Sequence, residues 1–202
     1  MKSLQLGRGE HGAIIGQTGT GKSVLARVII GDVTRLLVID PKGEFTLPNV
    51  EIFDDPKQII RKRIGRIIYR PKPSLLSDLD AYNRLYKWAY ERGNILVYTD
   101  DVVGVIPKQS PPPYLKICYQ MGRSRNVRCL SCYQRPFLVP LVLKSEVTKA
   151  YVFRLLVPQD VREVQSFVPG YSPDKLETRY SFAFYDCNKM DRAEYTRLQL
   201  RK

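Results

Sequence analysis

One stretch near the amino end of the chain constrains the fold more than any other. Residues 16–23 read GQTGTGKS and satisfy the pattern G-x-x-x-x-G-K-[ST] in full. A short apolar segment, Gly12–Ile15, precedes this loop, and Lys22–Ile30 follows it with helical spacing of its apolar residues. The glycines permit the positive φ angles that turn successive N–H groups inward around a phosphate, and a helix N-terminus adds partial positive charge. This strand–loop–helix unit predicts an α/β nucleotide-binding domain.

Each position of the loop has an expected role. We predict that the loop backbone binds the phosphates of ATP, that Lys22 reaches the β and γ phosphates, and that the Ser23 hydroxyl ligates Mg²⁺. The residues assigned to the nucleotide are Gly16, Gln17, Thr18, Gly19, Thr20, Gly21, Lys22 and Ser23. The alternative is a chance glycine-rich turn, which the flanking strand and helix patterns disfavour.

The chain also carries the acidic group that such a loop requires. Asn94–Thr99 has the apolar character of a buried strand, and two adjacent carboxylates, Asp100 and Asp101, follow it. Successive residues at a strand end point in different directions, so the two acids can perform different tasks. We expect Asp100 to bind Mg²⁺, directly or through water, and Asp101 to orient and polarise the attacking water. The competing interpretation is a solvent-exposed acidic turn.

Strand-like and helix-like segments alternate along the chain, whose 202 residues suit one α/β domain. Leu36–Ile39 is an apolar run typical of a strand buried on both faces. The other predicted strands are Val50–Phe53, Arg66–Tyr69, Val127–Tyr133, Ala150–Leu156 and Tyr180–Tyr185, and the other predicted helices are Ser77–Glu91, Tyr114–Gly122 and Pro158–Phe167. We therefore predict one domain, residues 1–202, with an open, mostly parallel sheet. Residues from about 157 to 202 are expected to form a small extension packed on the core.

Basic residues are in excess and unevenly placed. The chain holds 33 Lys and Arg against 20 Asp and Glu, for a formal net charge of +13. Two blocks, Lys57–Lys72 and Gly104–Ser145, contain basic residues and no acid. This favours a polyanion partner, most often a nucleic acid, over charge that only keeps the protein soluble. Within the second block, Lys108 and Lys116 are candidates for DNA contact, and the absence of a sequence-reading module predicts non-specific binding.

The first basic block has two interpretations. Lys57–Lys72 interleaves its charges with isoleucines. Either the isoleucines join the core and the charges face water, or the charges face a DNA-lined pore, a viral membrane or a capsid vertex. The residues alone leave both open.

Other residue types suggest chemistry that the pattern then disfavours. Cys129 and Cys132 are spaced C-x-x-C, but on a predicted strand their sulfurs point to opposite faces, whereas zinc pairs converge on tight turns. We therefore expect no zinc and read the cysteines as buried, reduced thiols. His11, the single histidine, is expected to be structural or exposed rather than catalytic. No apolar run is long enough to span a bilayer, and the amino end lacks the apolar region of a signal peptide.

Three further segments resemble a family. "LLVIDPKGEF" (Leu36–Phe45), "GRSRNV" (Gly122–Val127) and "YQRP" (Tyr133–Pro136) follow the loop in the order found in the FtsK–HerA superfamily of DNA-pumping ATPases. The resemblance implies a RecA-like core in which the strand before Gln134 lies between the loop strand and the strand before Asp100. It implies that Gln134 sits between the catalytic water and the γ-phosphate. It also implies an arginine finger, for which Arg123 aligns better than Arg125, and a ring, usually of six subunits, with ATP at subunit interfaces.

The length and motif layout look most like the genome-packaging ATPases of tailless icosahedral, membrane-containing viruses. The resemblance implies an ATP-driven double-stranded DNA translocase that acts in the host cytoplasm or at the packaging vertex, with capsid or vertex proteins as partners and only indirect membrane contact. Asp101 departs from the family, which usually has glutamate there. The alternatives are a segregation or conjugation motor of the same superfamily and, from another class, a small P-loop kinase or NTP-dependent switch.

Overall fold

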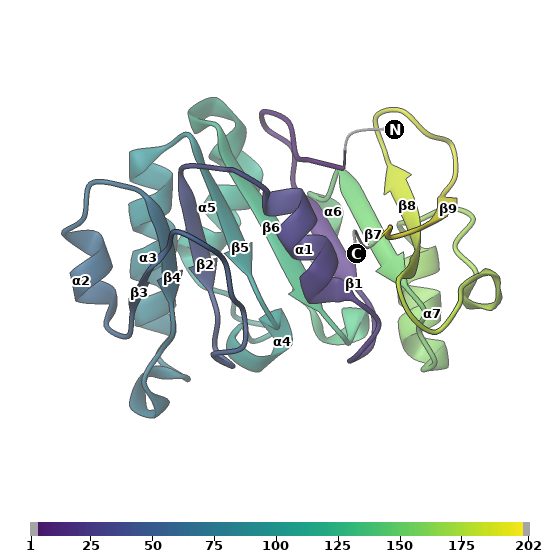
Figure 1. Cartoon of the computed structure of the whole chain (residues 1–202), viewed down its shortest axis with the longest axis horizontal. Helices are drawn as coiled ribbons and strands as arrows, with labels where there is room; N and C mark the ends of the chain where they lie inside the picture. The colour runs from purple at the N-terminus through teal and green to yellow at the C-terminus, as the bar shows by residue number, and fades with distance from the viewer. Residues whose placement is uncertain (1–3, 200–202) are drawn as a thin grey trace.

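The protein forms a single twisted sheet with helices on both faces (Figure 1). The structure is a computed structural model and describes residues 4–199. The strands are β1 (Gly12–Ile15), β2 (Leu36–Ile39), β3 (Glu51–Phe53), β4 (Arg66–Tyr69), β5 (Ile95–Thr99), β6 (Val127–Tyr133), β7 (Lys149–Phe153), β8 (Ser181–Asp186) and β9 (Glu194–Arg197). The α-helices are α1 (Lys22–Ile30), α2 (Pro56–Ile60), α3 (Leu79–Arg92), α4 (Val102–Val105), α5 (Pro113–Met121), α6 (Val142–Ser145) and α7 (Pro158–Gln165).

The sheet order confirms the predicted core. Within residues 4–199 the strands run β3-β4-β2-β5-β6-β1-β7-β8-β9, and β1 to β7 are parallel wherever they pair. Strand β6 therefore lies between the loop strand β1 and the acid-bearing strand β5. Strands β8 and β9 are antiparallel and continue the sheet beyond β7, whereas α7, which also follows residue 157, packs against the core.

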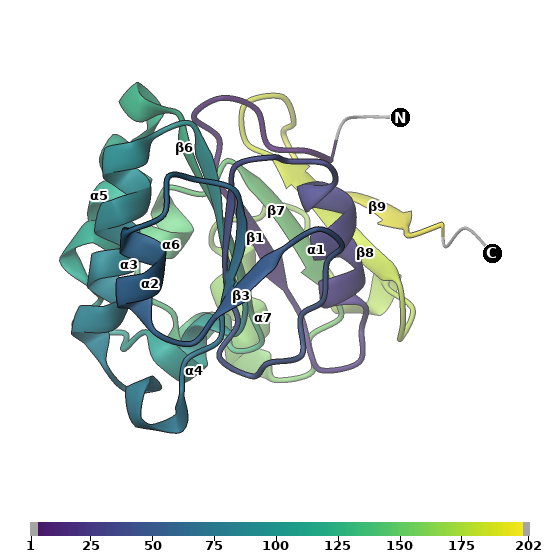
Figure 2. The ribbon, with the colours of Figure 1, turned by 60° about the vertical axis from the view of Figure 1, so that its left-hand side comes forward.

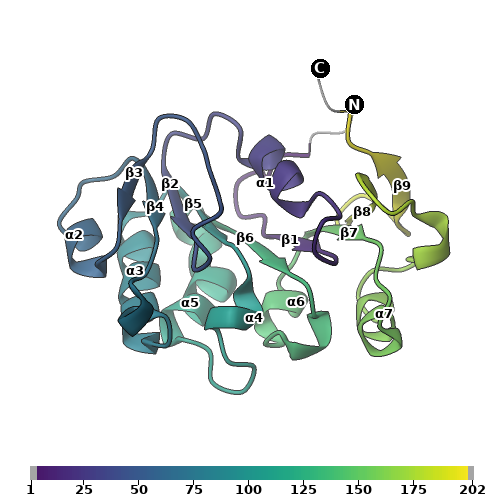
Figure 3. The same cartoon turned by 60° about the horizontal axis from the view of Figure 1, so that its bottom comes forward.

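The two faces of the sheet are covered unequally. Helix α1 packs on one face, whereas α2, α3, α5 and the later helices lie on the other (Figures 2 and 3). Each central strand alternates its apolar side chains between the two cores, so Ile14 joins the α1 side and Ile15 the opposite side. A sheet buried on both faces explains why these strands read as continuous apolar runs.

Most predicted elements are present, with shifts of a few residues at their ends. Asp78 is the N-cap of helix α3, since its side chain accepts a hydrogen bond from the Ala81 N–H. The sequence did not predict α2, α4, α6 or β9, which are four or five residues long. Elements this short have no complete hydrophobic period to detect.

The basic block Lys57–Lys72 is not one element. It comprises α2, a turn and β4, and its isoleucines are buried or packed against the core, as the first interpretation expected. Several of its charges are also engaged within the chain. Lys62 pairs with Glu51, Arg66 donates to the carbonyls of Gly31 and Val33, Arg70 pairs with Asp40, and Lys72 pairs with Asp54.

Candidate functional site

A nucleotide-sized cavity lies where the carboxyl ends of β1, β5 and β6 meet, the usual ligand position in an open parallel sheet. Its volume is about 320 Å³. It brings together eight of the residues predicted from the sequence, which are Thr18, Gly19, Gly21, Lys22, Ser23, Asp100, Asp101 and Gln134. Val24, Lys42, Glu44, Cys132, Tyr133 and Tyr180 complete the lining. Gly16, Gln17 and Thr20 shape the loop without lining the cavity.

The loop backbone requires its glycines. Gly19 and Gly21 have φ angles of 79° and 111°, which a residue with a side chain rarely adopts. A Cβ at Gly21 would also come within 2.8 Å of a ring carbon of Tyr180. Thr20 closes the turn by donating from its hydroxyl to the Gln17 carbonyl over 2.8 Å. The loop is therefore already curled in the conformation expected of a phosphate cradle.

Lys22 is held inside the loop. Only 8% of its surface is exposed, and its Nζ donates to the Gln17 carbonyl over 2.7 Å. Burial lowers the pKa of Lys22, while nearby Cys132, Asp100 and Asp101 oppose that shift. A cation held by one neutral carbonyl can readily exchange that partner for a phosphate oxygen.

Asp100 is oriented by a neighbouring tyrosine. The Tyr98 hydroxyl donates to Asp100 Oδ1 over 2.8 Å, and 9% of Asp100 is exposed. Burial raises the pKa of Asp100, hydrogen bonds from Tyr98 and Cys132 oppose the rise, and the charge of Asp40 adds to it. A partly buried carboxylate with an oriented oxygen, on the same cavity as the Ser23 hydroxyl, fits the hard oxygen ligands that Mg²⁺ prefers.

Asp101 begins helix α4 in a left-handed conformation, with φ of 52°. Its Oδ2 lies 2.6 Å from Lys42 Nζ. The sequence did not assign Lys42 to the site, although it belongs to the DPKGEF stretch that carried the resemblance. The turn that carries Lys42 is held in place by the fully buried Asp40. The Asp40 carboxylate accepts hydrogen bonds from the N–H groups of Glu44 and Phe45 and pairs with Arg70.

Gln134 directly follows β6 and touches the phosphate-binding loop. The Thr18 hydroxyl donates to Gln134 Oε1 over 3.1 Å. The next residue, Arg135, pairs with the buried Asp160 of α7 over 2.6 Å, which anchors this segment to the core. Gln134 therefore lies between the phosphate-binding loop and the end of β6.

Tyr180 is a lining residue that no motif indicated. It precedes β8, more than 150 residues after the loop in sequence, and its N–H donates to the Thr20 carbonyl over 2.9 Å. Sheet continuation through β7 and β8 brings it there. Only the tertiary fold could reveal this contact.

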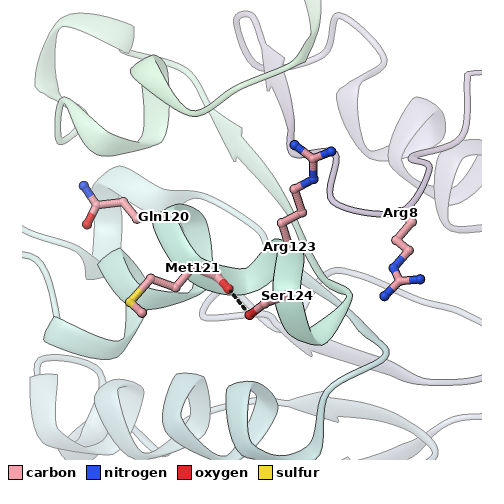
Figure 4. A pocket seen from close by; sticks show the side chains of 5 residues that line it. All are labelled: Arg8, Gln120, Met121, Arg123 and Ser124. Carbon is pink, nitrogen blue, oxygen red and sulfur yellow. Dashed lines mark hydrogen bonds between the residues drawn. The ribbon is translucent and has the colours of Figure 1, made fainter.

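The two candidate arginines lie away from this cavity, just before the amino end of β6, and their surroundings differ. Figure 4 shows Arg123 with the other residues that line the hollow beside it. Arg125 donates to the Glu91 carbonyl over 3.2 Å and stacks over Tyr90 at 5.0 Å. Arg123 is exposed and lines a shallow hollow of about 720 Å³ with Arg8, Gln120, Met121 and Ser124. No other residue of 4–199 bonds its guanidinium, so Arg123 is available to a partner and Arg125 is engaged within its own chain.

The cysteine pair has the geometry expected of strand residues. Cys129 packs in the core on the α3 and α5 side, and Cys132 packs in the core on the α1 side. Among residues 4–199, no three His, Cys, Asp or Glu side chains cluster as a metal site would require. His11 is buried, and its Nδ1 accepts the N–H of Cys129 over 3.0 Å, so it supports β6 structurally.

Comparison with known proteins agrees with this geometry. The profile of the family "Helicase HerA, central domain" matches residues 9–93. The DNA packaging ATPase P9 of Enterobacteria phage PRD1 is 29% identical over 161 residues, which cover 77% of this chain and 69% of P9.

Solved structures extend the likeness over nearly the whole chain. The genome packaging NTPase B204 of Sulfolobus turreted icosahedral virus 2, in complex with sulfate, aligns with a TM-score of 0.79 at 14% identity, covering 98% of this chain and 100% of B204. The pCW3 conjugation coupling protein TcpA aligns with a TM-score of 0.63 at 16% identity, covering 94% of this chain and 60% of TcpA. At these identities the structures establish the fold alone.

The fold and the cavity define a P-loop ATPase of the RecA-like class, which binds a nucleotide at the carboxyl edge of its sheet. Within that class the chain is similar to the FtsK–HerA family, since the matching HerA profile covers the GQTGTGKS loop and the DPKGEF segment. Among residues 4–199, no helix combines the length and apolarity needed to cross a membrane.

Proposed function

We propose that this protein is an ATP-hydrolysing double-stranded DNA translocase that packages a viral genome into a preformed capsid. The observation that carries the proposal is the single cavity that joins the phosphate-binding loop, Asp100, Asp101 and Gln134. The similarity to the packaging ATPase P9 over 77% of the chain supports the packaging role.

The positions of these side chains support the following hydrolytic step. The curled loop and Lys22 bind the triphosphate, and Ser23 and Asp100 provide the oxygens that would hold Mg²⁺, an ion that would neutralise charge on the phosphates. Asp101 orients a water and accepts its proton as the water oxygen bonds to the γ-phosphorus. The bond to the β-γ bridging oxygen breaks, and ADP and phosphate leave. Gln134 contacts the loop through Thr18 and is placed to detect the loss of the γ-phosphate.

The cavity lacks one component, since no arginine lines it. Arg123 lies near the opposite end of β6 and has a free guanidinium, so a neighbouring copy could receive it. We propose a head-to-tail ring, of six subunits as in the family, in which Arg123 of each subunit reaches the γ-phosphate of the next.

DNA contact is assigned to basic side chains that are exposed and make no bond to another residue of 4–199. Within the two basic blocks, and apart from Arg123, these are Lys57, Arg61, Arg63 and Lys116. Lys108 instead lies over the Phe137 ring at 3.9 Å, so it is a weaker candidate than the sequence suggested. Each phosphate that such a side chain neutralises should add about 0.9 to the salt slope of DNA binding.

Two alternatives remain distinguishable by experiment. The fold shared with TcpA also fits a conjugation or segregation motor. The packaging proposal, by contrast, places the protein at a capsid vertex or in the host cytoplasm. A small P-loop kinase would need an acceptor site, and the nucleotide cavity shows none beyond the loop, the acids and the sensor.

The deciding measurement is the ATPase rate of the full chain with and without long duplex DNA. We expect duplex DNA to stimulate hydrolysis and Lys22→Ala to abolish it. Lys62→Met is the matched control, because Lys62 forms an exposed pair with Glu51 away from the cavity. An unstimulated rate, together with phosphoryl transfer to a small acceptor, contradicts the motor. A stimulated rate without binding to capsid shells favours the segregation or conjugation alternative.

A further inference from the structure

The Lys42–Asp101 ion pair is a feature of the site that hydrolysis alone does not explain. Lys42 Nζ lies 2.6 Å from Asp101 Oδ2, and both residues line the nucleotide cavity. The Asp101 side chain is 19% exposed and that of Lys42 is 42% exposed. The pair therefore lies at the rim of the cavity, where a nucleotide can reach the ammonium group.

Both backbones that carry this pair are fixed. Asp40 accepts two N–H groups of the Lys42 turn, from Glu44 at 3.2 Å and Phe45 at 3.1 Å. Asp101 is held at the start of α4, where the Gly104 N–H donates to its carbonyl over 3.0 Å. With both ends anchored, only the long, flexible lysine side chain is free to change partner.

The pair opposes the role assigned to Asp101. A carboxylate that activates water needs an oxygen free to accept the water hydrogen, and here one oxygen of Asp101 contacts the ammonium group of Lys42. The bond to Asp101 raises the pKa of Lys42, and the charges of Asp100 and Glu44 raise it further, so Lys42 stays cationic beside any anion that enters.

We propose that Lys42 exchanges partners during the ATP cycle: its ammonium group holds Asp101 while the cavity is empty, and moves to the terminal phosphate when ATP binds, which frees Asp101 for the attacking water. Lys42 is thus a phosphate-contacting residue, and its change of partner leaves Asp101 free only when a γ-phosphate is present. This role rests on the proposed ATPase function. It means that Asp101 is paired with Lys42, and so cannot activate water, until ATP is bound.

The test compares nucleotides with and without a γ-phosphate on the full chain. Affinities for ADP and for the methylene analogue AMPPCP are measured by titration calorimetry, and kcat and KM by phosphate release. Lys42→Met should weaken AMPPCP binding about tenfold, the lower end expected for a lost charge-assisted bond because Asp101 is given up in exchange. It should leave ADP affinity unchanged and raise KM for ATP. Lys42→Arg should restore most of the AMPPCP affinity.

Lys62→Met is the matched control, since Lys62 forms an exposed pair of similar length, 2.5 Å, with Glu51. It should change neither nucleotide. Equal AMPPCP affinity in Lys42→Met and the unmodified protein overturns the exchange, as does an equal loss for ADP and AMPPCP, which would mean that the pair only shapes the cavity. Lys22→Ala separates this result from the function itself: if it retains full hydrolysis, the ATPase assignment fails, whatever Lys42 does.

Discussion

Arg123 and Arg125 are separated by one residue, and the structure predicts opposite consequences for their removal. Arg123→Ala breaks no hydrogen bond or ion pair within residues 4–199, so the free energy of unfolding should change by no more than about 0.5 kcal/mol. Arg125→Ala loses the bond to the Glu91 carbonyl and the stacking over Tyr90. Each is worth about 1 kcal/mol, so a loss of about 1–2 kcal/mol is expected in urea unfolding.

In the ATPase rate the order should be the opposite of that in stability, with Arg123→Ala the more damaging of the two substitutions. An arginine finger contributes about 10³–10⁵ in rate, so Arg123→Ala should lower DNA-stimulated ATP hydrolysis by at least about 10³. Arg125→Ala should keep the rate within about threefold of the unmodified protein, since its guanidinium serves its own chain and a surface of this kind tolerates substitution.

Mixing subunits tests whether Arg123 acts on a neighbour. Arg123→Ala has an intact cavity and Lys22→Ala has an intact finger. In a randomly mixed ring at equal amounts, roughly a quarter of the interfaces combine the intact cavity with the intact finger. The mixture should therefore regain about a quarter of the unmodified rate, although each variant alone is inactive. Absence of recovery in rings shown to contain both subunits refutes a trans arginine.

Three further perturbations follow from buried groups. Burial lowers the pKa of His11 to about 4, so between pH 6.5 and pH 4 the unfolded chain binds a proton at His11 and the folded chain does not. The free energy of unfolding, measured with urea, should therefore fall by about 2 kcal/mol between pH 7 and pH 5. His11→Gln should largely remove this pH dependence. Asp40→Ala removes the buried carboxylate that pairs with Arg70 and should lower the free energy of unfolding by about 3–5 kcal/mol. Glu51→Ala breaks only an exposed pair and should lower it by less than about 1 kcal/mol. A thiol reagent applied to the native protein should label Cys187, the exposed cysteine, and the other three thiols only after unfolding; rapid labelling of more than one thiol contradicts the packing.

The core of the site was predictable because its chemistry is local. GQTGTGKS fixes a loop conformation through its glycines, and an apolar strand that ends in Asp100 and Asp101 places acids at the carboxyl edge of a parallel sheet. The position of β6 between β1 and β5 came from the family resemblance, and the sheet order confirms it.

The remaining parts depend on contacts between distant segments. Lys42 reaches Asp101 because β2 and β5 are adjacent, and Tyr180 reaches the loop because β8 follows β7 at the sheet edge. Neither adjacency leaves a periodic trace in the sequence. The choice between Arg123 and Arg125 likewise required the position of Tyr90 on α3, which decides which guanidinium is already engaged.

Strand β6 carries Gln134 just beyond its last residue and Arg123 shortly before its first. β5 pairs with residues 127–131 of this strand and β1 with residues 130–133, so every residue of it is paired with at least one neighbouring strand. Such a strand cannot slip in register by itself, because a shift of one residue would reverse every buried side chain. In the proposed ring, the two ATP sites served by one subunit are therefore joined by a rod of about 23 Å that does not stretch. Movement at one site can reach the next only as a rotation of the whole subunit, and the step on DNA would then be set by that angle.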